Sequence, residues 1–472
     1  MTLNLNDVAT TLPDDLDERV SGSAEDTLRH LLADLSTKPA PVSRLARLWI
    51  LGSVHAKIAA AYLVYWVRTS YATADEKERR LNETHLSAAI KLLGVMGYLR
   101  GAIMKAGQML SAYPNVLPDQ FVDTLSTLHF EAPPMHYSLL REFVRNELGA
   151  DPETLFDEFE TRAFAAASLG QVHRARLKTG ELVAVKIQYP GIANTIAADC
   201  RNMLALFSPM RLSRDWDNIR EQWDDIRRTL EAETDYVREA QYLERARAAF
   251  REDEGVKVPR TYPALCTPRV LTMQYFDGLH IEHYLAGNPS QEERDRYGRL
   301  IMLASFRLAH KAKFWYADSN PGNYLFLPDG TLGLLDFGCV REFTTDEWDF
   351  YVQVWKVYQE GGRGLREAML RAGDFDPARP VDEDHIRFLE DYSHWWSDYM
   401  MTDELFDFGD EAFMRRGIEF ITQVAERRYF RTLPVNVWIT RQLLGLRALA
   451  FRLKARVNMK QLGQQESWDL GH

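Results

Sequence analysis

The segment 317–338, ADSNPGNYLFLPDGTLGLLDFG, constrains the fold of this chain more than any other. Two apolar runs flank Asp329-Gly330, and an Asp-Gly pair between such runs is a strong signal for a β-hairpin. A hairpin folds its two ends together, so Asp318 and Asn323 before it should lie close to Asp336 after it. The sequence therefore predicts one site built from both ends of this hairpin.

The spacing of these residues matches the needs of phosphoryl transfer on a kinase scaffold. Such a scaffold uses an Asp near the acceptor, an Asn five residues later on a metal, and the Asp of a DFG turn on metal between the phosphates. Asp318 and Asn323 have the Asp-x4-Asn spacing, and Asp336-Phe337-Gly338 follows the hairpin. Oxygen ligands of this kind suit Mg²⁺. We expect Asn323 and Asp336 to bind Mg²⁺ and Asp318 to be a base or a carboxylate beside the metal.

A second hairpin upstream carries a candidate phosphate-binding lysine. QVHRARL, the turn KTGE and LVAVKIQY predict two strands, with Lys186 at the end of Val-Ala-Val-Lys. A lysine at this place reaches the α- and β-phosphates of ATP and is held by a carboxylate from a helix. The helical stretch around 221–250 offers four carboxylates: Glu231, Glu233, Asp235 and Glu239. We choose Glu239 as the partner of Lys186.

Two features of peptide kinases are missing from the sequence. No Gly-x-Gly-x-x-Gly precedes the lysine strand, and the matching place holds the alanine-rich run 164–170, FAAASLG. Alanine lacks the positive-φ freedom of glycine, so this loop should cover phosphates with a different geometry. After Gly338 the chain has no Ala-Pro-Glu and no room for a long activation segment, which is the docking platform for peptides. A peptide substrate is therefore disfavoured.

With these motifs, the chain resembles the UbiB family of AarF-domain, kinase-like proteins from about residue 85 to 455. Lys105-Ala-Gly-Gln108 matches the family's K-x-G-Q, and its Lys and Gln share a helix face. The resemblance implies that this helix lies over the site where a protein substrate would otherwise bind. It also implies nucleotide-binding roles for an alanine-rich loop and a gate formed by E-x-D. The matching residues are Ala165, Ala166, Ala167 and Ser168 in the loop, and Glu233 and Asp235 in E-x-D.

The chain departs from the family at two places. The family usually has D-P-H-P-G-N where this chain has Asp318-Ser319-Asn320-Pro-Gly-Asn323, and Asn320 cannot titrate as His would. Gly170 replaces the Ala of some members, and we expect it to loosen the phosphate loop. Two further candidates for nucleotide binding, Gln274 and Tyr275, end the strand expected in PRVLTMQYFDG.

The order of the elements predicts an α+β chain with a bilobal protein-kinase-like fold. The expected parts are an acidic, loosely ordered lead-in at 1–42, a helical extension with K-x-G-Q at 43–150, an N-lobe with a small antiparallel sheet and a helical insertion at 151–278, and a helical C-lobe at 279–472. A helix is expected at about 291–313, and everything after about 344 reads as helical.

Charge and composition exclude several other functions. A net charge of −11 argues against a nucleic-acid binder, which needs a basic surface. The three cysteines lack CxxC spacing, as expected in a reducing cytoplasm. The apolar stretch 48–67 contains His55 and Lys57, so it should not span a membrane. That stretch and 436–456 also have the spacing of core helices, so we expect a cytoplasmic protein with at most peripheral membrane contact.

The expected function is an ATP- and Mg²⁺-dependent atypical kinase or ATPase. By its resemblance it would support ubiquinone or other isoprenoid-lipid metabolism, with an isoprenoid lipid or lipid-biosynthesis proteins as partners. One alternative is a small-molecule kinase of the choline or aminoglycoside type, although such enzymes have no reason to carry K-x-G-Q. The other is a nucleotide-binding scaffold without useful catalysis. The sequence names neither the acceptor nor the oligomeric state.

Overall fold

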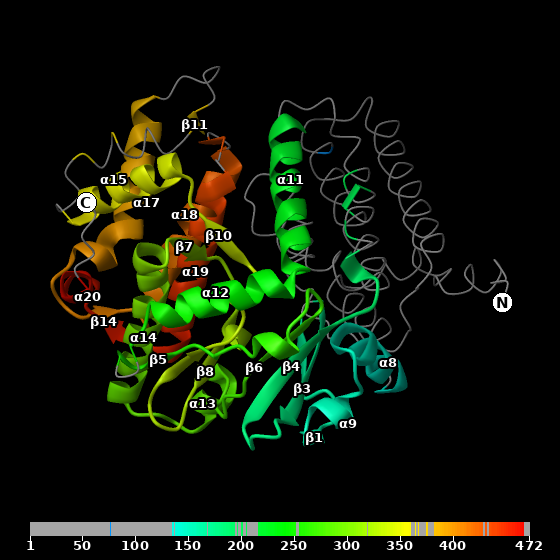
Figure 1. Ribbon diagram of the computed structural model, residues 1–472. Helices are drawn as coiled ribbons and strands as arrows, with labels where there is room; N and C mark the ends of the chain where they lie inside the picture. The colour runs from blue at the N-terminus through cyan, green and yellow to red at the C-terminus, as the bar shows by residue number, and fades with distance from the viewer. Residues whose placement is uncertain are drawn as a thin grey trace. The chain divides into compact units, whose positions relative to one another are not determined.

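The computed structural model describes residues 137–167, 169–193, 216–251, 254–318, 320–359, 382–427 and 434–466, together with isolated positions outside them (Figure 1). The chain divides into two compact units, and each is described by itself. The first takes in Met1–Phe143, Thr161–His173 and Ile187–Thr234, and the second takes in Val144–Glu160, Arg174–Lys186 and Asp235–His472.

A five-stranded sheet has the order β1-β3-β4-β6, with β2 also paired to β3. Its strands are β1 (Glu158–Phe159), β2 (Ala165–Ala167), β3 (Gly170–Arg176), β4 (Leu182–Gln188) and β6 (Val270–Gln274). Gly180 makes the turn between β3 and β4 with a φ of +89°, a conformation that glycine adopts without strain. Leu177 N donates to Glu181 O at 2.9 Å and closes this turn. The hairpin predicted around KTGE is therefore confirmed.

Within the helical stretch expected around 192–252, the described residues include the helices α11 (Trp216–Glu233) and α12 (Tyr236–Ala248). Asp235 ends the helical run and caps α12, since its side chain accepts hydrogen bonds from the backbone N–H groups of Val237 and Arg238. An aspartate N-cap stabilises a helix by about 1 kcal/mol. This cap fixes where α12 begins, and therefore where the side chains of its first turn lie.

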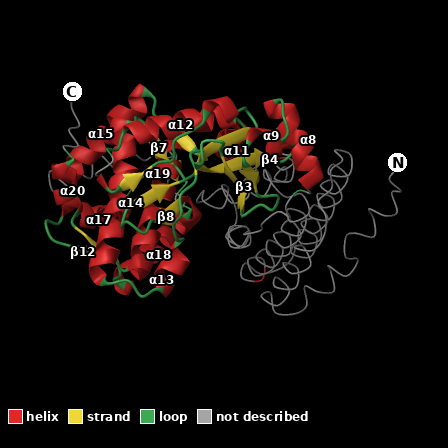
Figure 2. Ribbon diagram, turned by 60° about the horizontal axis from the view of Figure 1, so that its bottom comes forward, coloured by secondary structure: helices red, strands yellow, loops and turns green. Residues whose placement is uncertain are grey.

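The core of the second unit is built around helix α14 (Gln291–Lys311), which packs against β7 (Phe314–Tyr316) and α19 (Pro434–Leu453) (Figure 2). Ser290 and Glu293 form a capping box at its start. Strand β7 pairs antiparallel with β10 (Val340–Glu342). The predicted second hairpin is confirmed as β8 (Tyr324–Phe326) and β9 (Leu332–Leu334), with β5 (Val256–Lys257) parallel to β9.

The remaining elements are short or lie towards the C-terminus. The helices are α8 (Tyr137–Leu148), α9 (Pro152–Leu155), α13 (Ile281–Ala286), α15 (Thr345–Gln359), α17 (Glu383–Met401), α18 (Glu411–Arg427) and α20 (Met459–Gln465), with 3-10 turns η3 (Pro263–Leu265) and η4 (Pro321–Asn323). Two-residue strands also pair there: β11 (Asp374–Phe375) with β13 (Phe430–Arg431), and β12 (Phe406–Asp407) with β14 (Arg456–Val457). The prediction that everything after 344 is helical was thus wrong at these strands, while the α+β class is confirmed. The bilobal arrangement and the helical extension stay predictions.

A buried arginine of α14 forms an ion pair with a glutamate at the end of the described chain. Arg307 is 3% exposed and forms ion pairs with Glu254 and Glu466. Its Nε donates to Glu466 at 2.7 Å, and a second guanidinium nitrogen donates to the other oxygen of the same carboxylate. A buried charge is tolerated only when it is paired in this way.

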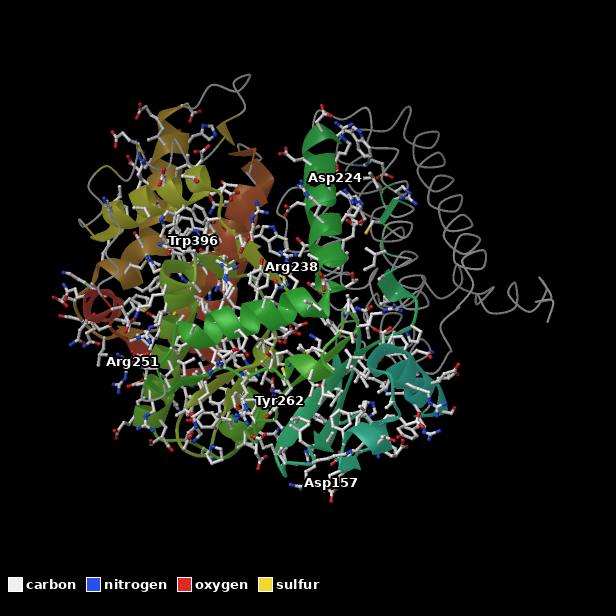
Figure 3. The ribbon with its side chains drawn as sticks, in the orientation of Figure 1. Asp157, Asp224, Arg238, Arg251, Tyr262 and Trp396 are labelled. Carbon is white, nitrogen blue, oxygen red and sulfur yellow. The ribbon has the colours of Figure 1, made fainter. Side chains whose placement is uncertain are left out.

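A second buried arginine, Arg447 of α19, lies among aromatic rings of α17. Its guanidinium carbon is 4.0 Å from the ring centre of Trp395, 4.7 Å from that of Trp396 and 4.6 Å from that of Tyr399 (Figure 3 labels Trp396). Its Nη2 donates to the carbonyl oxygens of Trp395 and Trp396. The expected 436–456 helix therefore packs in the protein's own core, as its spacing suggested. No helix in the described part of the chain is long and apolar enough to cross a bilayer, and the stretch 48–67 lies outside that part.

Candidate functional site

A buried ion pair lies at the centre of the site in the second unit. Lys186 is the fifth residue of β4, and its Nζ donates to Oε1 and Oε2 of Glu239 at 2.8 and 2.9 Å. The two residues are 7% and 2% exposed. The ring centre of Tyr236 lies 5.0 Å from the same ammonium, which adds a cation–π contact. Glu239 is in the first turn of α12, so the Asp235 cap determines its position. The partner chosen from the sequence is the one that the structure brings to Lys186.

Asp336 joins the ion pair from the far end of the β8–β9 hairpin. Its Oδ2 lies 3.1 Å from Lys186 Nζ, and its Oδ1 accepts from Gly338 N at 2.8 Å. Burial alone would lower the pKa of the Lys186 ammonium. The nearby carboxylates of Asp336 and Glu239 outweigh this effect and raise the pKa well above its ordinary value. Lys186 is therefore a fixed cation at neutral pH.

The hairpin register places Asn323 beside Asp336. Tyr324 pairs with Leu334, and Leu335 N donates to Asn323 O at 3.0 Å, so Asp336 is the next residue after this contact. Asn323 Nδ2 donates to the backbone oxygen of Asp318 at 3.1 Å, which leaves the amide oxygen available as a ligand. An amide oxygen and a carboxylate are hard donors, and Mg²⁺ binds few protein ligands beside phosphates and waters. The residues present fit Mg²⁺. The described residues contain no cluster of three or more His, Cys, Asp or Glu side chains suited to a metal.

Asp318 follows β7 and is 7% exposed. One of its oxygens, Oδ1, lies 3.3 Å from the backbone nitrogen of Asn320 and 3.5 Å from Nη2 of Arg441. The side chain of Asn320 accepts from Gly322 N at 2.9 Å and holds the η4 turn. The residue that replaces the family's usual His thus has a structural role in shaping the turn before Asn323. Ser319 lies outside the described residues.

Two buried tyrosines lie close to the carboxylates of Asp318 and Asp336. Tyr316 and Tyr324 are each 1% exposed, and their rings meet edge to face at 6.2 Å. Neither hydroxyl has a hydrogen-bond partner among the described residues. Burial, followed by the other tyrosine and the carboxylates of Asp336 and Asp318, raises the pKa of Tyr316 far above its ordinary value. These hydroxyls therefore stay protonated beside the site.

The alanine-rich run forms a short strand in the first unit instead of an open loop. Ala165, Ala166 and Ala167 pair antiparallel with the first residues of β3, and Ala165 and Ala166 are exposed. The expectation that Gly170 loosens this region was wrong. A Cβ at Gly170 would collide with the carbonyl oxygen of Ile187, so glycine permits the close approach of two backbones.

The candidates at the end of β6 are held by the sheet. Gln274 is half-buried, and its N donates to Arg260 O at 2.9 Å. Tyr275 N donates to Leu182 O at 3.1 Å, and its hydroxyl accepts from Arg174 Nη2 at 2.8 Å. Arg174 thus contacts both the hydroxyl and the ring of Tyr275, with its guanidinium carbon 4.6 Å from the ring centre.

Of the predicted gate, only the E-x-D residues belong to the described part of the chain. Glu233 is 7% exposed at the end of α11, whereas Asp235 is exposed and caps α12. Lys105 and Gln108 lie outside the described residues, as does Ser168 of the alanine run. The gate therefore stays a prediction.

Arg441 is the site residue that reasoning from the sequence missed. It lies on α19, 123 positions after Asp318 in the chain. No motif or local pattern marks it, because basic residues on an amphipathic helix are common. Only the packing of α19 against α14 shows that this side chain faces the site.

Comparison with known proteins identifies the family of the chain. The ABC1 atypical kinase-like domain matches residues 127–364, which is half of the sequence. AarF domain-containing kinase 1 of Drosophila melanogaster is 32% identical over 66% of this chain and 61% of its own length. Atypical kinase COQ8B of Rattus norvegicus is 31% identical over 71% of this chain and 64% of its own length. The chain thus spans less than two thirds of these curated relatives.

A solved structure has a similar fold. Rv3197 of Mycobacterium tuberculosis, in a complex with erythromycin, is 26% identical, with a TM-score of 0.57 over 83% of this chain and 98% of that one. Atypical kinase COQ8 of Saccharomyces cerevisiae is 31% identical over 66% of this chain. The kinase-like motifs around Lys186, Asn323 and Asp336 lie inside the matched domain. The chain belongs to the ABC1 family of atypical kinase-like proteins, which is the UbiB or AarF family that its motifs resemble.

Proposed function

We propose that this chain binds ATP with Mg²⁺ and acts as an atypical kinase or ATPase. The observation that carries the proposal is the convergence of Lys186, Glu239 and Asp336 in one ion-paired cluster beside Asn323. Glu239 holds the Lys186 ammonium in place, and that ammonium is suited to the α- and β-phosphates. Asn323 and Asp336 would hold Mg²⁺, which when bound neutralises charge between the β- and γ-phosphates. Asp318 is positioned to orient or deprotonate an acceptor.

The acceptor is proposed to be something other than a peptide. Only residues 339–344 separate Gly338 from α15, and Val340 already pairs with Tyr316 of β7. This short return supports the absence of a peptide-docking segment. Two of the curated relatives are named atypical kinase COQ8 and COQ8B, and the family that the motifs resemble is the UbiB family. By that likeness we propose that the activity supports ubiquinone or other isoprenoid-lipid metabolism, with Lys105 and Gln108 as a gate and with at most peripheral membrane contact.

Thermal melting with and without Mg-ATP tests the proposal. Mg-ATP should raise the Tm, because a ligand that binds the native state stabilises it by mass action. Asp336→Asn should abolish most of this increase, since it removes the charged metal ligand. The matched control is Asp329→Asn at the turn of the same hairpin, where the exposed Asp329 pairs with Lys257. An unchanged Tm increase in Asp336→Asn would place the nucleotide elsewhere, and no increase in the wild type would reject the proposed function.

A further inference from the structure

Arg441 brings a second cation to the site, separate from Lys186. Its Nη2 lies 3.5 Å from Oδ1 of Asp318, and the two side chains are 19% and 10% exposed. Trp438 lies almost one helical turn earlier on α19, with its ring centre 5.6 Å from the guanidinium carbon. Trp438 is itself 2% exposed, so the face of the helix that carries Arg441 is anchored in the core. The guanidinium is therefore held at the site by packing.

The other amino group of this guanidinium has hydrogen-bonding capacity that the protein does not use. Arg441 Nη1 is buried, and no acceptor for it exists among the described residues. A buried charged donor without a partner is destabilising, and most such groups in native proteins are satisfied by protein, water or ligand. Nη2 is directed to Asp318, so an acceptor for Nη1 would lie beside the same carboxylate. An anionic oxygen is the partner that a guanidinium binds best.

The charges of the neighbouring groups favour a phosphoryl oxygen as that acceptor. Lys186 is already compensated by Glu239 and Asp336. In phosphoryl transfer, negative charge is spread over the oxygens of the transferred group, and an arginine supplied by the same chain can stabilise it. Among the described residues, Arg441 is a cation in contact with Asp318, the residue assigned to the acceptor side. Arg441 thus adds a cation at Asp318, whereas Lys186 is paired with Glu239 and Asp336.

We infer that Arg441 positions Asp318 through Nη2 and donates Nη1 to the transferred phosphoryl group, an inference that rests on the proposed function. In this step the bond from the γ-phosphorus to the bridging oxygen breaks, and its electron pair leaves with ADP. A bond forms from an oxygen of water or of an acceptor hydroxyl to the same phosphorus. The proton of that nucleophile goes to Asp318. Arg441 neither gains nor loses a proton in this step, and it forms no covalent bond.

The test compares a nucleotide with a mimic of the transferred group. Melting is measured with Mg-ADP and with Mg-ADP plus aluminium fluoride, which occupies the place of the γ-phosphoryl, and ATP hydrolysis is followed in parallel. Arg441→Met should keep the Tm increase from Mg-ADP, lose the additional increase from aluminium fluoride, and lower kcat about 100-fold or more. Arg441→Lys should restore part of both, because it returns the charge without the two-pronged geometry.

The matched control is Arg452→Met, which removes an arginine from the same helix. Arg452 pairs with Glu282 at 2.8 Å and is placed by that pair outside the site. This variant should behave as the wild type in both measurements. If the wild type responds to Mg-ADP and to aluminium fluoride, and Arg441→Met keeps both responses, the inference is wrong while the proposed function stands. If the wild type does not respond to Mg-ADP, both are rejected.

Discussion

Lys186 Nζ lies 3.1 Å from Oδ2 of Asp336, a residue 150 positions later in the sequence. Strand β4 of one hairpin and the residues after β9 of the other are thus joined by a direct ion pair. A site whose charged groups already converge loses little entropy when it binds a substrate. The same arrangement makes stability and ligand binding depend on one cluster of charges, and this dependence can be measured.

Replacing Glu239 by Gln should destabilise the protein by about 3 kcal/mol, because it leaves a buried lysine with a weaker partner. The measurement is the free energy of unfolding in urea. The double variant Lys186→Met with Glu239→Leu should recover most of that loss, since an apolar pair of similar volume can replace a buried ion pair. It should nevertheless show no Tm increase with Mg-ATP. A Glu239→Gln variant as stable as the wild type would contradict the burial of the pair.

Replacing Tyr316 by Phe should leave the stability nearly unchanged or raise it slightly. The hydroxyl is buried, and no described residue accepts from it or donates to it. Removing an unsatisfied polar group therefore removes a desolvation cost without breaking a bond. The tilted contact of the ring with Phe337, at 4.9 Å between centres, is kept. A loss above about 1 kcal/mol in urea unfolding would instead reveal a bound water at the hydroxyl.

The stability should fall below neutral pH in part through His310. Burial, followed by the charge of Lys313, lowers its pKa from 6.5 to about 4. The unfolded chain therefore takes up a proton below about pH 6.5 that the folded chain refuses, so this stability is present above pH 6.5 and is lost as the pH falls towards 4. His310→Phe suits the aromatic neighbours Trp348 and Tyr351. In this variant, the free energy of unfolding should fall by about 2 kcal/mol less than in the wild type between pH 6.5 and pH 5.

The control for this prediction is His283→Gln, which alters an exposed histidine of α13. Urea unfolding at several pH values is compared for the wild type and both variants. Parallel curves for His310→Phe and the wild type would show that another group causes the dependence.

Generic peptides should not be phosphorylated by the purified protein. Gly338 is connected to α15 by residues 339–344 alone, and this connection includes β10. It is too short to form a peptide-docking segment. Incubation of a peptide library with radiolabelled ATP measures this directly, with ATP hydrolysis in the same tube as the positive signal. Labelling at the roughly 1–100 per second of ordinary kinases would contradict the prediction.

The parts of the structure that the sequence predicted well are set by neighbouring residues. The turns at Gly180 and Gly330 have φ values of +89° and +78°, which glycine marks in the sequence. The Asp-x4-Asn spacing and the DFG turn are local patterns too, and the hairpin between them brings their ends together. The cap at Asp235 could also have been found, because an aspartate directly before a helical run is a recognised N-cap signal.

The features that the sequence did not reveal depend on contacts between distant segments. The contact of Arg441 with Asp318 exists because α19 packs against α14, and no periodicity encodes that packing. The strands β11 to β14 have two residues each, too short for an alternating pattern to show. Gly170 was misread because the carbonyl of Ile187, which excludes a side chain there, is seventeen positions away in the chain.

The pairing of Arg307 with Glu466 has a consequence for the order in which the chain can fold during synthesis. Helix α14 is complete once residue 311 has been made, but its buried guanidinium receives the carboxylate of Glu466 only when residue 466 has emerged from the ribosome. Until then Arg307 must remain hydrated, because an incompletely paired charge is costly in a closed core. The core around α14 therefore closes only after residue 466 has emerged, and until then the nascent second unit exposes apolar surface to chaperones.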